Sequence, residues 1–137
     1  KPQHIRLELT ESAIFDDFNM VINNMEKFNK SGIKFYLDDF GTGYSNLERI
    51  IGCPFYTIKF DKSLLYKSID NSAVSDIVSH LTSVFKKQGF VLLIEGVEND
   101  EQADYSINKG FDYIQGYKYA KPQPVIKLRE YFNKATA

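Results

Sequence analysis

Strand-like and helix-like segments alternate along the whole chain, and this alternation constrains the fold more than any other feature of the sequence. Four of the expected helices end at a glycine, as helices commonly do: Gly32, Gly52, Gly89 and Gly110. Strict alternation of strands and helices is typical of a parallel sheet covered by helices. The sequence therefore predicts an α/β fold and one folding unit spanning residues 1–137.

The apolar pattern predicts five strands, at residues 4–9, 33–37, 56–60, 90–94 and 111–119. Residues 90–94 are apolar throughout, which suits a strand buried on both faces. The first two expected helices run over residues 14–28 and 44–51. The next two begin at a cap, at Asn71 or Ser72 and at Asn99, and end at Gly89 and Gly110. The last begins at Pro124 and has Val125, Leu128 and Phe132 on one face. Residues 61–63 are expected to form a loop.

The composition is that of a globular chain with almost no net charge. Its 137 residues carry a formal net charge of -1, so binding to DNA or RNA through the nucleic-acid backbone is not expected. A ligand that carries phosphate would need bound cations. The single Cys53 excludes an internal disulfide and fits a reducing compartment. No signal peptide or membrane-length apolar run is visible, so a cytoplasmic location is expected.

Each expected strand has one polar side chain at or near its carboxyl end, facing away from its apolar neighbours. Ligands bind at that end of parallel α/β sheets. A single such residue is more simply a solvated strand end, but the full set is expected to meet at one point: Glu8, Asp38, Lys59, Glu95 and Gln115, with Asp39 beside Asp38. Converging carboxylates need a counter-charge. Since the expected ligands are oxygen atoms, the set favours Mg²⁺ or Mn²⁺ over zinc.

The stretch from Phe35 to Ser45 brings two adjacent acids to a loop that contains two glycines. Gly41 and Gly43 allow the backbone to turn sharply beside these acids. Such a stretch is one way to hold a hard metal ion at the mouth of an α/β fold. It is equally an ordinary transition from a strand to a turn, where Asp and Gly are common.

Five motifs occur in one order: Glu8-Leu9-Thr10-Glu11-Ser12, Asp38-Asp39-Phe40-Gly41-Thr42-Gly43-Tyr44-Ser45, Ile58-Lys59-Phe60-Asp61, Glu95-Gly96-Val97-Glu98 and Gln115-Gly116-Tyr117. Together they resemble the carboxyl-terminal part of an EAL-type cyclic-di-GMP phosphodiesterase domain, over essentially the whole chain. The resemblance implies a partial (β/α)8 TIM-like barrel, with about five parallel strands that alternate with helices. It also implies hydrolysis of cyclic di-GMP to linear pGpG.

The resemblance implies a two-metal site. Glu8 and Asp38 would bind one ion, and Asp38 would bridge to a second ion that Asp39 and Glu95 help to hold. Two such cations, about 3.5–4 Å apart, activate a water and stabilise displacement at phosphorus. Lys59 would lie near the attacking water, and Lys59 and Glu95 remain alternative general bases.

Further roles are implied around this centre. Gln115 would lie near the metals and their water. The segment from Asp39 to Leu47 would control metal and substrate binding, and it includes Phe40, Gly41, Thr42, Gly43, Tyr44 and Ser45. Glu11 would brace this loop. Glu98 would order the site or a dimer contact near it.

The chain also departs from the family pattern. The Glu-Ala-Leu strand, a following Asn that binds the first metal, and three early strands are absent, so we expect a piece of a longer protein that binds metal weakly and has little activity alone. Tyr56 stands where the family often has Asp, and Ile94 where it often has Ala. Open sheet edges favour self-association or a homodimer. The parent could carry a sensor, a GGDEF-type domain or a membrane anchor.

Three other interpretations stay open. The domain could bind cyclic di-GMP without cleaving it, although broken motifs would then be expected and those present are intact. It could be a protein-interaction scaffold without nucleotide affinity. It could also be an unrelated α/β enzyme with a carboxylate metal site, which five ordered motifs make the weakest alternative.

Overall fold

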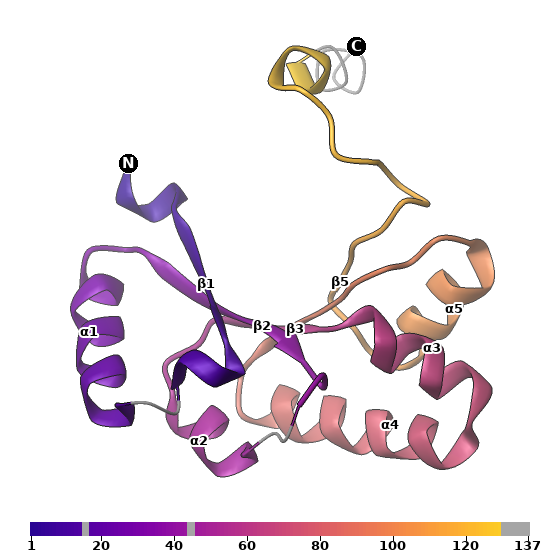
Figure 1. Cartoon of the computed structure of the whole chain (residues 1–137), viewed down its shortest axis with the longest axis horizontal. Helices are drawn as coiled ribbons and strands as arrows, with labels where there is room; N and C mark the ends of the chain where they lie inside the picture. Colours follow the sequence, from indigo (N-terminus) through magenta and orange to yellow (C-terminus); the bar gives the residue numbers. More distant parts are fainter. Residues whose placement is uncertain (15–16, 44–45, 130–137) are drawn as a thin grey trace.

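A five-stranded parallel sheet lies at the centre of the computed structural model, which describes residues 1–14, 17–43 and 46–129 (Figure 1). The strands are β1 (Arg6–Thr10), β2 (Lys34–Phe40), β3 (Thr57–Phe60), β4 (Val91–Ile94) and β5 (Tyr113–Ile114). They lie side by side in the order of the sequence, and every neighbouring pair is parallel. In doubly wound sheets the order reverses, whereas (β/α)8 barrels keep it. The predicted α/β fold with barrel-type strand order is confirmed.

Helices connect the strands and cover one face of the sheet (Figure 1). They are α1 (Phe18–Lys30), α2 (Leu47–Gly52), α3 (Lys62–Asp70), α4 (Ser72–Lys87) and α5 (Asp100–Asn108), with short 3-10 turns η1 (Pro2–His4) and η2 (Glu11–Ile14) near the amino terminus. The first turn of the chain and the segment after β5 lie on the other side of the sheet. No helix in the described residues is long and apolar enough to cross a membrane.

Side-chain alternation decides which residues form the core. Leu37, Ile58 and Leu92 are completely buried beneath the helices. The ring of Phe40 meets those of Phe60 and Phe85 edge-on, with centroid separations of 4.8 and 5.3 Å. Because successive strand residues point to opposite faces, the polar residues between these apolar ones are directed to the uncovered face.

Several predicted boundaries differ from the observed ones. Ile14 lies in η2, because a new helix begins after Asp17, whose side chain accepts a hydrogen bond from the Met20 amide. The predicted strand over 111–119 shortens to the two residues of β5. The chain turns there, since the Lys118 amide donates to the Val97 carbonyl and the Tyr119 amide donates to the Gly116 carbonyl.

Two predicted helices are described only in part. The helix expected over 44–51 is observed from Leu47, with the Asn46 side chain as its cap, and residues 44–45 lie outside the described residues. A helix follows Pro124 as expected. Its Val125 is 68% exposed, so this residue does not contribute to a buried helix face. Phe132 lies outside the described residues.

The prediction that residues 61–63 form a loop is wrong. They begin α3, and the Asp61 carboxylate accepts a 2.8 Å hydrogen bond from the Ser63 amide. Only Asn71 separates α3 from α4, and its side chain caps the second helix. Two consecutive helices therefore connect β3 to β4.

Replacing Asp61 by alanine is expected to lower the free energy of unfolding by about 1 kcal/mol at neutral pH, because the cap of α3 is lost. Burial alone raises the pKa of Asp61, but hydrogen bonds from Ser63 and Lys62 outweigh it and hold the pKa below its ordinary value. The ionised cap stabilises the fold above the unfolded-state pKa, and this contribution disappears as pH falls through the folded-state pKa. Urea titrations of the chain at several pH values measure both effects.

Asp61→Asn is the matched control for this prediction. Asparagine caps helices about as well as aspartate, so this variant is expected to keep most of the stability but lose the pH dependence at this position. Equal stability of the wild type and the alanine variant at neutral pH would contradict the capping role.

Candidate functional site

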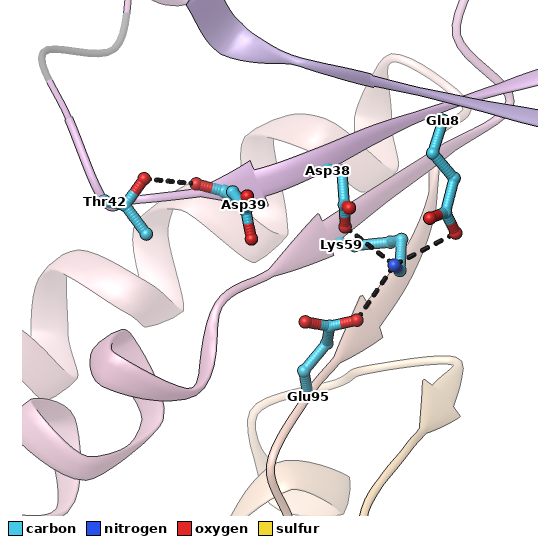
Figure 2. Close-up of polar contacts among 6 residues, drawn as sticks. All are labelled: Glu8, Asp38, Asp39, Thr42, Lys59 and Glu95. Atoms are coloured by element: carbon cyan, nitrogen blue, oxygen red, sulfur yellow. Dashed lines mark hydrogen bonds and ion pairs between the residues drawn. The ribbon is translucent and has the colours of Figure 1, made fainter. Parts of the chain in front are cut away.

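The ammonium of Lys59 lies at the centre of a carboxylate cluster on the uncovered face of the sheet (Figure 2). Its Nζ atom is 2.7 Å from Asp38 Oδ1, 2.9 Å from Glu95 Oε1 and 3.0 Å from Glu8 Oε1. These side chains come from β1, β2, β3 and the end of β4. Of the six side chains expected to meet at one point, these four are in direct contact.

Strand register explains how distant residues reach this cluster. Thr10 on β1 pairs with Asp38 on β2. Glu8 lies two residues before Thr10, so its side chain is on the same face as that of Asp38. Lys59 on β3 pairs with Leu93 on β4, and Glu95 lies one repeat further along. The lysine side chain is long enough to contact both Glu8 and Glu95, although they lie at different positions along the strands.

A backbone irregularity directs Asp39 toward the same cluster. Adjacent residues of a regular strand face opposite ways, which would separate Asp39 from Asp38. The pairing register between β2 and β3 shifts here, and Asp39 has a positive φ of 56°, a conformation that aspartate adopts more readily than most residues. As a result, Asp38, Asp39 and Glu95 each place one carboxylate oxygen within 4.8 Å of the others.

The bulge also returns the next residue to the core. Phe40 is 1% exposed, so its side chain faces the helices although Asp38 and Asp39 face the site. Thr42 holds the turn, because its amide and hydroxyl both donate to the Asp39 carbonyl, at 3.3 and 3.0 Å. Gly41 has a φ of +97°, which favours glycine.

These residues fit a divalent metal ion in their donor chemistry. Carboxylate oxygens are the ligands that Mg²⁺ and Mn²⁺ prefer, and the cluster already surrounds a cation, the Lys59 ammonium. Burial by itself lowers the pKa of Lys59, but hydrogen bonds to Asp38, Glu95 and Glu8 outweigh it and raise the pKa above its ordinary value. The three acidic neighbours of Lys59 therefore favour its charged form.

An open pocket of about 360 Å³ adjoins the cluster on the side of Glu95. Gln115 lies in its wall, held by a hydrogen bond from its amide to the Ile94 carbonyl and by one that its carbonyl accepts from the Val97 amide. Glu98 also lines the pocket. The remaining lining residues are Asp61, Lys62, Glu95, Gly96, Gly116 and Tyr117.

The pocket adds residues that were not among the predicted site residues. Asp61 and Tyr117 lie inside two of the motifs, and that position in the sequence is the signal that could have identified them. Lys62 had no such signal, because it lies just beyond the motif that ends at Asp61.

Glu11 lies beneath the loop that follows β2. It is 8% exposed, and its Oε1 atom has no hydrogen-bond partner in the described part of the chain. Its Oε2 atom is 3.7 Å from the position that a Cβ at Gly43 would occupy. This placement is compatible with a bracing role, which stays a prediction. Tyr44 and Ser45 lie outside the described residues.

The strands are parallel and follow the order of the sequence, and carboxylates gather at their carboxyl ends. These features define a barrel-type α/β domain with a cluster of oxygen ligands suited to a metal ion. The family model described as the EAL domain matches residues 1–122. The chain belongs to the EAL domain family.

Similar proteins agree with this assignment. The chain is 35% identical over 133 residues to cyclic di-GMP phosphodiesterase PdeL of Escherichia coli, covering 94% of this chain and 36% of PdeL. It superposes with a TM-score of 0.84 on the MucR phosphodiesterase of Pseudomonas aeruginosa in complex with cyclic di-GMP, at 29% identity, covering 93% of this chain and 51% of that one. It superposes with a TM-score of 0.82 on BlrP1 of Klebsiella pneumoniae in a manganese and cyclic-di-GMP complex, at 25% identity, covering 89% and 31%. The chain thus spans well under two thirds of the length of the curated relatives it matches.

Proposed function

We propose that this chain is part of a phosphodiesterase that hydrolyses cyclic di-GMP to linear pGpG. The observation that carries the proposal is the cluster of Glu8, Asp38, Asp39 and Glu95 at the carboxyl ends of the strands of an EAL-family fold. The phosphodiesterase PdeL and the cyclic-di-GMP complexes of MucR and BlrP1 support the choice of substrate.

The proposed cofactors are two divalent cations, Mg²⁺ or Mn²⁺. Glu8 and Asp38 would hold one, and Asp38, Asp39 and Glu95 would hold the other. When bound, the ions would supply an activated water and neutralise the charge on the phosphate. Such neutralisation is needed, because the carboxylates of Glu8, Asp38, Asp39 and Glu95 would repel a phosphodiester.

The remaining residues have proposed roles that follow their positions. Lys59 positions the attacking water. Either Lys59 or Glu95 takes the proton of this water. Gln115 and Glu98 contact the nucleotide in the pocket beside Glu95. Glu11 supports the loop after β2, so that the Asp39 carboxylate stays directed at the metals.

The direct test measures the full-length gene product with cyclic di-GMP and Mg²⁺ or Mn²⁺. Release of pGpG, followed by chromatography, is the expected result. Calorimetry with Ca²⁺ present measures cyclic-di-GMP binding separately from turnover. Binding without hydrolysis under every metal condition would instead identify a catalytically silent binding module, and absence of both would leave a scaffold.

We further propose that the 137-residue chain folds as one unit, has little activity alone and self-associates. β1 forms an edge of the described sheet, where Ile5 is 46% and Leu7 36% exposed. Beside it lies an apolar pocket of about 180 Å³ that includes Leu9, Met25 and Phe28. Light scattering is expected to give a mass above that of one chain, and a monodisperse monomer would contradict self-association.

A further inference from the structure

We propose that Lys59 competes with the metal ions for their carboxylate ligands and thereby sets the metal affinity of the site. The lysine ammonium already lies between the carboxylates that are proposed to hold the metal ions. The inference rests on the proposed metal site, but it concerns the affinity of that site and not the hydrolytic reaction.

The competition follows from the number of donors and acceptors. An ammonium group has three N–H donors, and Lys59 has one carboxylate oxygen within hydrogen-bonding distance for each. Two of these acceptors, Asp38 and Glu95, also belong to the group whose oxygens lie close enough to share an ion. A divalent cation bound there would use the same oxygens as ligands and would repel the ammonium.

Burial makes this exchange costly. Lys59 is 6% exposed, and the side chains of Asp38 and Glu95 are 23% and 20% exposed, so the ion pairs are partly shielded from water. Charge pairs in such surroundings are stronger than pairs on an open surface. The entering cation must therefore replace contacts that the wild-type protein already makes.

One acid is excluded from the lysine contacts. In the described part of the chain, the ion pairs of Lys59 reach Glu8, Asp38 and Glu95 but not Asp39. The bulge nevertheless places an Asp39 oxygen with those of Asp38 and Glu95. Asp39 thus supplies a carboxylate that a cation can engage before the lysine is displaced.

The test is the affinity of the chain for Mn²⁺, measured by calorimetry. Lys59→Met is expected to bind Mn²⁺ at least about tenfold more tightly than the wild type, which corresponds to about 1.4 kcal/mol of binding free energy. Lys67→Met, on the exposed surface of α3, makes the same change in net charge and is expected to stay within about twofold of the wild type, because distant surface charges are screened. Equal or weaker binding by Lys59→Met would overturn the proposal.

A measurement on the wild type covers the case in which Lys59→Met does not fold. The ¹⁵Nζ and proton signals of the Lys59 ammonium report whether its contacts with the three carboxylates persist. Titration with Mg²⁺ is expected to shift these signals and accelerate their exchange with water, and unchanged signals at saturating Mg²⁺ would overturn the competition. If no form of the chain binds either metal, the competition is also wrong, whereas the pGpG assay on the full-length gene product decides the proposed function independently.

Discussion

Replacing Asp38 by asparagine in the full-length gene product is expected to lower kcat/KM for cyclic-di-GMP hydrolysis by at least about 100-fold, since loss of groups that merely support metal ligands already costs about 10–100-fold. Asp38 is the carboxylate proposed to bridge both metal ions. It also makes the shortest of the three contacts to Lys59, at 2.7 Å. Asparagine has nearly the same shape but no charge, so the variant tests the charge and not the packing. The measurement is the rate of pGpG release over a range of Mg²⁺ and Mn²⁺ concentrations.

Asp104→Asn is the matched control for this experiment. It makes the same chemical change at an exposed position on α5, and its rate is expected to stay within about twofold of the wild type. Circular dichroism establishes that both variants are folded. Wild-type hydrolysis by folded Asp38→Asn would contradict the proposed bridging role and, with it, the two-metal site.

The alternation of strands and helices along the chain was predictable because period-two and helical apolar patterns are local properties of the sequence. The missed helix α3 shows the limit of that approach. The apolar pattern predicts a loop at Asp61, but this aspartate caps α3, and only Asn71 divides α3 from α4. Two helices joined through one residue have no glycine between them, so the sequence contained no stop signal of the kind that ended the other helices.

The convergence of polar side chains at one end of the strands was predictable, but the orientation of Asp39 was not. Alternation along the strands correctly placed Glu8, Asp38 and Lys59 on one face. The same alternation would turn Asp39 away from Asp38, and the bulge that prevents this depends on pairing with β3. The sequence predicts divalent cations as the counter-charge, whereas the contacts of Lys59 with carboxylates from three other strands are a tertiary property.

Replacing Gly116 by alanine is expected to lower the free energy of unfolding by about 3 kcal/mol or more, because the added methyl group would clash with the backbone atoms of Val97. A Cβ atom built on Gly116 lies 2.6 Å from the Val97 carbonyl carbon and closer still to its oxygen and nitrogen. Val97 cannot move aside easily. It is completely buried, its amide donates to the Gln115 carbonyl, and its carbonyl accepts from the Lys118 amide. Denaturant unfolding of the chain measures the change.

Gly52→Ala separates this steric effect from the general effect of adding a methyl group. Gly52 is the last residue of α2, and the nearest atom to its added Cβ would be Phe18 Cζ, at an ordinary 3.7 Å. This variant is expected to lie within about 1 kcal/mol of the wild type. If the two variants were equally stable, the close approach of residues 97 and 116 would not exist in solution. The backbone contacts that place Gln115 beside Glu95 would then be wrong, and the pocket proposed for the nucleotide would lose one wall.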